Sequence, residues 1–288
     1  MDKHPPDILV SVFRGCRLAL HLLYGMLLAI FYPHQNQARQ RRILKAWSRQ
    51  LLTILNIGIQ TDGQQPMRGK GGYLIVANHV SWLDILVLNA IYPSRFIAKS
   101  EVRSWPFIGW LCKRSGAIFI ERAMRRDAAL TTQRVSHLLK QGICVGLFPE
   151  GTTTDGKQVG HFHSALIQPA IDAGARLCPI ALHYLDEQGG PGSAAAFIGD
   201  ITLVQSIWRI LRCRHYTALA VFTPTLVASN GNRRVLARAA QEAIAHGLQN
   251  ISPKKQEPKT IFAFPQTRLS AQSGYVLLLD PALNKLPK

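Results

Sequence analysis

The amino-terminal part of the chain lacks acidic residues. No Asp or Glu occurs between Asp7 and Asp62, whereas Lys and Arg stand at positions 14, 17, 39, 41, 42, 45 and 49. The whole chain has 34 Lys and Arg against 16 Asp and Glu, a formal net charge of +18. This imbalance predicts an anionic partner. Charge alone does not separate nucleic acid, an anionic lipid surface and a phosphorylated substrate. No RNP, zinc-finger or other nucleic-acid signature accompanies the charge, so we expect no nucleic-acid partner.

Cysteine is scarce and scattered. The five residues are Cys16, Cys112, Cys144, Cys178 and Cys213. Their odd number, wide spacing and mostly apolar neighbours suggest neither a disulfide framework nor a CxxC metal site, and they favour a reducing compartment.

Metal ligands are equally sparse. His161 and His163 would share one face of a strand and are possible ligands. They have no convincing third ligand near them in the sequence, and a helix is expected to begin there. We therefore predict no metal and no bound cofactor.

The longest apolar run near the amino terminus is short for a bilayer span. The run LALHLLYGMLLAIFY, residues 18–32, has fifteen residues. As a helix it measures about 22 Å, against roughly 30 Å of bilayer hydrocarbon. Extension back to Ile8 takes in Arg14 and Arg17, which can snorkel to an interface. A secretory signal peptide is the alternative, but no small-residue cleavage site follows the run.

A basic amphipathic pattern follows this run. Residues 37–60 place apolar side chains at helical spacings and cations on the other side. This pattern is typical of a helix on an anionic membrane, although a helix packed on a protein core would also show it. We predict that residues 1–60 form a membrane-associated helical element.

The rest of the chain alternates short apolar runs with helical patterns. Strands are expected at 73–77, 95–99, 117–121, 143–148, 177–184 and 218–227, and helices at 81–91, 124–141, 161–174 and 232–248. Several of these runs are apolar throughout, as buried parallel strands are. The alternation predicts one α/β domain over residues 61–251, with a mostly parallel sheet flanked by helices. Residues 252–288 form a tail to which the sequence assigns no role.

The segment NHVSWLD brings a possible general base near a carboxylate. On a continuous helix His79 and Asp84 would lie about 140° apart. They can meet if His79 lies on the loop after a strand and a helix begins at Ser81. Ser81 and Asp84 also fit the capping box [ST]-x-x-[DE], which gives the carboxylate a purely structural role. A neutral imidazole beside a carboxylate suits deprotonation of a hydroxyl.

Four blocks in order give this pair a context. They are Asn78-His79 to Asp84, Gly116 to Arg122, Phe148 to Thr152, and Cys178-Pro179-Ile180. This set resembles the membrane glycerolipid acyltransferases of the lysophosphatidic acid acyltransferase family, over roughly residues 70–227. That family carries N-H-x-x-x-x-D, G-x-I-F-I-x-R, F-P-E-G-T and V-P-[IV] blocks. The resemblance implies a glycerolipid acyltransferase-like fold on the cytoplasmic face of a membrane.

The resemblance also implies a reaction. His79 takes the proton from the free hydroxyl of a lysolipid while Asp84 orients the imidazole. The hydroxyl oxygen then attacks the thioester of acyl-CoA or acyl carrier protein. The blocks offer no covalent nucleophile, so we expect direct transfer to 1-acyl-glycerol-3-phosphate, giving phosphatidic acid. By the same resemblance, acceptor binding falls to Gly116, Arg122, Phe148, Pro149, Glu150, Gly151 and Thr152.

One departure from the family pattern concerns the acceptor. Many relatives continue the third block with Arg, whereas Thr153 stands at that position here. Lys157 or His161 would have to replace this cation, or the acceptor has another head group, as in a lyso-ornithine lipid. Two further alternatives remain, a non-catalytic binding protein that uses its charge and a thioesterase that uses the same pair on water.

Overall fold

The computed structural model describes residues 8–66, 71–120, 125–229 and 231–250. Two helices, α1 (Ile8–Phe31) and α2 (Gln37–Ile54), precede the sheet. The sheet strands are β1 (Ile57–Asp62), β2 (Tyr73–Ala77), β3 (Arg95–Lys99), β4 (Ile118–Ile120), β5 (Val145–Leu147), β6 (Arg176–Leu185), β7 (Tyr216–Phe222) and β8 (Leu226–Val227). The other α-helices are α3 (Leu83–Ile91), α4 (Ile108–Arg114), α5 (Arg125–Lys140), α6 (Gln168–Ala173), α7 (Leu203–Leu211) and α8 (Arg233–Gln249).

The strands form one mixed sheet in the order β1-β7-β6-β2-β5-β3-β4, and β8 pairs with β6. Pairing is parallel everywhere except between β6 and its neighbours β7 and β8. The predicted α/β class with a mostly parallel sheet flanked by helices is therefore confirmed.

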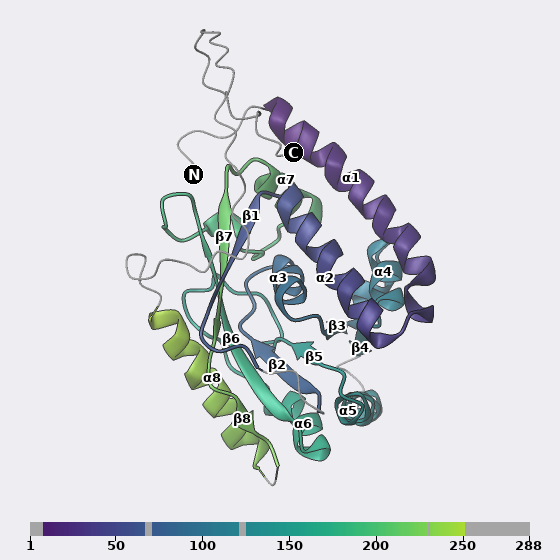
Figure 1. Ribbon diagram of the computed structural model, residues 1–288. Helices are drawn as coiled ribbons and strands as arrows, with labels where there is room; N and C mark the ends of the chain where they lie inside the picture. The colour runs from purple at the N-terminus through teal and green to yellow at the C-terminus, as the bar shows by residue number, and fades with distance from the viewer. Residues whose placement is uncertain (1–7, 67–70, 121–124, 230, 251–288) are drawn as a thin grey trace, which may run out of the picture.

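Helices cover both faces of the sheet. In Figure 1, α2 and α3 lie on one face and α8 lies on the opposite face. Strand β2 at the centre is buried on both sides, since Ile75 and Ala77 join the core under α2 and α3, while Leu74 and Val76 join the core under α5 and α8. This double burial explains why the run YLIVA is apolar throughout.

Helix α1 lies along the outside of the domain and is fastened to it at three places. Arg14 donates to the carbonyl of Cys213 at 2.8 Å, and the Arg114 Nε donates to the carbonyl of Ala29 at 2.9 Å. Between these points the His21 ring lies 3.0 Å from the Trp47 carbonyl. Many large apolar side chains of α1, among them Phe13, Leu20 and Leu27, are exposed. Within the described residues, 8–34 is the one helical stretch that is long and apolar enough to cross a membrane.

The structure corrects three predicted elements. The helix expected over 37–60 ends at Ile54, because Asn56 has a left-handed φ of 57° and the chain then enters β1. The helix expected over 161–174 is a 3-10 turn at Ser164–Ile167 followed by α6, which has Pro in its first turn. The strand expected over 218–227 is two strands, β7 and β8, because the chain departs from the ladder around Pro224.

Candidate active site

The site begins where β2 ends. The side-chain amide of Asn78 donates to the Leu182 carbonyl at 2.9 Å and accepts from the Leu182 N–H at 2.7 Å. This buried side chain therefore continues the pairing of β2 with β6 beyond Ala77 and fixes the point at which the chain leaves the sheet. His79 follows at the carboxyl edge of the sheet, where open α/β folds place their ligands.

His79 and Asp84 meet in the arrangement that their spacing allows, with His79 on the loop. The imidazole Nδ1 lies 2.8 Å from Asp84 Oδ2, with the side chain of His79 20% exposed and that of Asp84 fully buried. His79 lies on the loop, and Asp84 lies in the first turn of α3. Within the described part of the chain, Nε2 of His79 has no hydrogen-bond partner, so it is the nitrogen available to a substrate hydroxyl.

The capping box is not formed as predicted. Helix α3 begins at Leu83 without a side-chain cap, and the buried hydroxyl of Ser81 has no hydrogen-bond partner. Instead, Asp84 Oδ2 accepts from the backbone N–H groups of Val80 at 2.7 Å and Ser81 at 2.9 Å. The same carboxylate oxygen therefore satisfies the helix entrance and holds the imidazole.

Phe148 covers one face of the imidazole. The two rings stack with centroids 4.0 Å apart and planes 7° from parallel. Phe96 of β3 stacks in turn with Phe148 at a centroid distance of 5.7 Å. Because β5 delivers Phe148 beside the end of β2, the third sequence block lies directly against the first.

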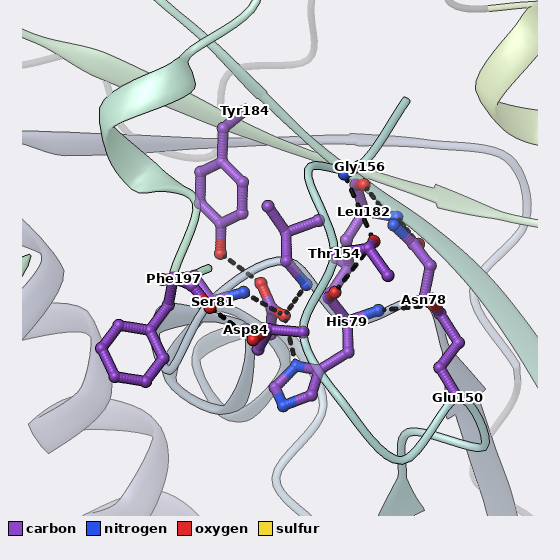
Figure 2. A network of polar contacts seen from close by, with 12 residues as sticks. Asn78, His79, Ser81, Asp84, Glu150, Thr154, Gly156, Leu182, Tyr184 and Phe197 are labelled. Atoms are coloured by element: carbon purple, nitrogen blue, oxygen red, sulfur yellow. Dashed lines mark hydrogen bonds and ion pairs between the residues drawn. The ribbon is translucent and has the colours of Figure 1, made fainter. Parts of the chain in front are cut away.

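Glu150 anchors the backbone of His79. Its Oε1 accepts from the His79 N–H at 2.9 Å and its Oε2 from the Gly160 N–H at 3.1 Å, as Figure 2 shows for the first bond. Burial raises the pKa of Glu150, and these two N–H groups offset part of the rise. Both carboxylate oxygens thus already have protein donors.

The rest of the third block forms the turn around Glu150. The Pro149 carbonyl accepts from the His163 N–H at 3.0 Å, Gly151 has a φ of 75°, and Thr152 is exposed. A residue with a side chain is strained at such a φ, so the glycine is required for this turn.

The second sequence block is divided between two edges of the sheet. Gly116, with a φ of 85°, precedes β4 and lies beside Arg95, which begins β3. Since β2, β3, β4 and β5 are parallel, Gly116 lies at the edge opposite to His79, whereas the carboxyl end of β4 at Ile120 shares the edge of His79. The predicted phosphate ligand Arg122 lies outside the described residues.

Thr153 stands where the family pattern leads us to expect Arg, and its hydroxyl is already bonded. It donates to the Phe197 carbonyl, and the Phe197 N–H donates to the Val80 carbonyl at 2.9 Å. The next residue, Thr154, donates its N–H to the His79 carbonyl at 2.8 Å. Two loops are thereby tied to the segment that carries His79.

The two proposed replacements for the missing cation are peripheral. Lys157 is exposed and pairs with Asp155 at 3.3 Å, and the exposed His161 ring meets His163 edge-on at a centroid distance of 5.7 Å. Among the residues that the structure describes, no three His, Cys, Asp or Glu side chains gather to hold a metal ion.

Sequence reasoning did not identify Tyr184 as part of the site. The hydroxyl of Tyr184, on β6, donates to Asp84 Oδ1 at 2.7 Å. The two residues are 100 positions apart, so no local spacing relates them.

An imidazole held by a buried carboxylate at the carboxyl edge of an α/β sheet is typical of enzymes that take a proton from a hydroxyl. A family model described as Acyltransferase matches residues 58–183 of this chain. The chain is 35% identical to a 1-acyl-sn-glycerol-3-phosphate acyltransferase of Neisseria meningitidis, an alignment that covers 81% of this chain and 91% of the relative. The chain therefore belongs to the acyltransferase family, and the predicted resemblance is confirmed.

Other relatives carry another acceptor in their names. A lyso-ornithine lipid O-acyltransferase of Pseudomonas aeruginosa is 36% identical, over 73% of this chain and 79% of that protein.

The crystal structure of the 1-acyl-sn-glycerophosphate acyltransferase PlsC from Thermotoga maritima superposes with a TM-score of 0.58. That match covers 82% of this chain and 96% of PlsC at 18% sequence identity, so it bears on the fold alone.

Proposed function

We propose that this protein transfers a fatty acyl chain from an acyl thioester, acyl-CoA or acyl carrier protein, to the free hydroxyl of 1-acyl-glycerol-3-phosphate. The product is phosphatidic acid. The observation that carries the proposal is the contact of His79 with the buried Asp84 in a chain of the acyltransferase family. The relative from Neisseria, which aligns over most of its length, supports this acceptor.

The proposed reaction is a direct transfer. His79 Nε2 takes the proton of the acceptor hydroxyl as its oxygen attacks the thioester carbonyl, and the imidazolium is stabilised by the Asp84 carboxylate 2.8 Å away. A C–O bond forms, the C–S bond breaks, and the imidazolium returns its proton to the departing thiolate. Base assistance of this kind supplies roughly 100- to 10,000-fold, and positioning and oxyanion stabilisation supply the rest.

In this proposal the third sequence block, Phe148 to Thr152, supports catalysis mainly by holding His79 in place. Phe148 stacks on the imidazole, and both oxygens of Glu150 accept backbone N–H groups, one of them from His79 itself. These contacts favour a positioning role for Glu150 over direct acceptor binding. Arg122 remains the proposed phosphate ligand, because a guanidinium grips phosphate through two parallel hydrogen bonds.

Membrane association is part of the proposal, with the active site on the cytoplasmic face. Helix α1 exposes large apolar side chains along its length, including Leu20 at 66% and Leu27 at 63%. Beside it, a groove of about 600 Å³ between α1 and α2 is lined partly by Arg39 and Arg42. Apolar area next to cations suits the interface of an anionic bilayer, where the lysolipid also lies.

The test is a transfer assay on a His79→Ala variant with lysophosphatidic acid and an acyl thioester. Both the released thiol and the acylated lipid are measured. We expect a loss of about 100- to 10,000-fold. His246→Ala, which changes an exposed histidine at the end of α8, is the matched control and should keep full activity. Unchanged acylation by the His79→Ala variant would overturn the proposal, and donor hydrolysis without any acylated lipid would favour a thioesterase.

A lyso-ornithine lipid is the second candidate acceptor, because Thr153 replaces a cation and its hydroxyl is bonded to the Phe197 carbonyl. The relative from Pseudomonas supports the same candidate. Parallel assays with lysophosphatidic acid and lyso-ornithine lipid separate the two. Acylation of the second alone would refute our first choice.

A further inference from the structure

Tyr184 is held rigidly behind the His79 and Asp84 pair. It lies near the end of β6, is only 3% exposed, and points its hydroxyl at Asp84, as Figure 2 shows. Its backbone is fixed as well, since it pairs with Ala218 of β7 and its carbonyl accepts from the Gly192 N–H at 2.8 Å. The phenol therefore has little freedom to leave the carboxylate.

The two carboxylate oxygens of Asp84 accept different numbers of hydrogen bonds. Oδ2 accepts from the His79 ring and from the N–H groups of Val80 and Ser81, at 2.7 to 2.9 Å. Oδ1 accepts from Tyr184 at 2.7 Å, and no other described residue donates to it. Since Asp84 is fully buried, Tyr184 is the group on which the second oxygen depends.

The phenol remains a donor in the working pH range. Burial raises the pKa of Tyr184 well above its usual value, and the neighbouring Asp84 carboxylate acts in the same direction. A hydrogen bond donated to a carboxylate disperses part of its negative charge. The charge that Asp84 presents to the imidazole is therefore smaller than that of a carboxylate without this bond.

We propose that Tyr184 is a positioning residue that orients Asp84 and limits how strongly this carboxylate stabilises protonated His79. Without the phenol, Asp84 favours the imidazolium more strongly, and less of the enzyme carries a free base at a given pH. The inference rests on the proposed role of His79 as the general base. Tyr184 itself is buried behind Asp84 and is not expected to touch either substrate.

Two other ionisable groups that face the pair belong in the interpretation of any pH profile. Tyr184 comes from β6, and Glu150 comes from the turn after β5, where it bonds to the His79 backbone. Glu150 makes no hydrogen bond to Tyr184 among the described contacts, so a change at Tyr184 acts on the pair through Asp84.

The first test is Tyr184→Phe in the full-length protein. We expect kcat to fall by about tenfold or less, KM to stay unchanged, and the acidic limb of the pH–rate profile to move upward by roughly half a pH unit. Tyr216→Phe is the matched control, since Tyr216 is a 4% exposed tyrosine of β7 whose hydroxyl accepts from the Cys213 thiol. Tyr216→Phe should lower the thermal midpoint of unfolding about as much as Tyr184→Phe does, but it should not move the pH–rate profile.

A second variant keeps the ring and the hydrogen bond. Site-specific 3,5-difluorotyrosine at position 184 is a stronger donor, so it should move the acidic limb to lower pH. Opposite shifts for the two changes support the inference, whereas shifts in the same direction or unshifted profiles overturn it. If His79→Ala is inactive while both Tyr184 variants behave like the parent, the proposed function stands and only this inference fails.

Discussion

Replacement of Asp84 by Asn tests the charge of the buried carboxylate while keeping its shape. The amide oxygen can take the place of Oδ2, where it still accepts from the His79 ring, the Val80 N–H and the Ser81 N–H. The amide nitrogen then faces the Tyr184 hydroxyl, which can rotate to accept. Every hydrogen bond therefore survives in the Asp84→Asn variant, but none of them involves an ionised group.

The expected magnitudes follow from this change. Charge-assisted hydrogen bonds contribute about 1.5–3 kcal/mol each and neutral ones about 0.5–1.5, but the cost of burying a charge disappears as well. We therefore expect the unfolding free energy to change by no more than about 3 kcal/mol. Activity should fall by roughly 100- to 10,000-fold, which corresponds to about 3 to 5 kcal/mol of lost transition-state stabilisation.

The assay compares kcat of thiol release with lysophosphatidic acid as acceptor, together with urea unfolding of the same preparations. Asp155→Asn is the matched control, because Asp155 is 45% exposed, pairs with Lys157 at 3.3 Å and belongs to a loop near the site. It should retain wild-type activity. A folded Asp84→Asn variant with kcat within about threefold of the parent would refute the idea that the Asp84 charge stabilises the imidazolium.

Three further predictions concern stability and membrane binding. Burial raises the pKa of Glu150, so ionisation of this carboxyl costs stability. The difference in unfolding free energy between the parent and Glu150→Gln, measured with urea, should therefore favour the parent most below pH 4.5 and shrink as the pH rises through the raised pKa. A difference that grows with pH would contradict this prediction. Ser81→Ala should change the unfolding free energy by less than about 0.5 kcal/mol, because the hydroxyl has no partner, whereas a working cap would contribute about 1 kcal/mol. Changing both Leu20 and Leu27 of α1 to Ser should weaken binding to anionic vesicles, measured by co-sedimentation, by about 100-fold or more without altering thermal unfolding. The control Val235→Ser on α8, where Val235 is 65% exposed, should change neither vesicle binding nor thermal unfolding. Equal vesicle binding by the two variants would exclude α1 as the docking surface.

The sequence was sufficient for features that depend on local pattern. Both β2 and β3 were predicted at their observed bounds, and for β2 the signal was an uninterrupted apolar run, because this central parallel strand is buried on both faces. The contact of His79 with Asp84 is the one that a spacing of five residues allows when His79 lies on the loop before the helix. A missed signal was available in Thr202 and Gln205, which form a capping box at the start of α7.

The remaining contacts of the site are long-range. Glu150 reaches the backbone of His79 across 71 positions, and Tyr184 reaches Asp84 across 100. They depend on which strand ends lie side by side, and the order β6-β2-β5 becomes known only in the folded sheet. The same limitation explains β1, whose residues continue an amphipathic helical pattern but pair with β7 instead.

Asp84 shows why a choice between capping and catalysis was too narrow. The structural alternative placed Ser81 and Asp84 in a capping box and gave the carboxylate no part in holding His79. Instead one oxygen of Asp84 receives both backbone N–H groups and the ring nitrogen, so the start of α3 fixes the carboxylate and the carboxylate fixes the imidazole. Any substitution that moves the entrance of α3 must therefore also change the base, even when it leaves His79 untouched.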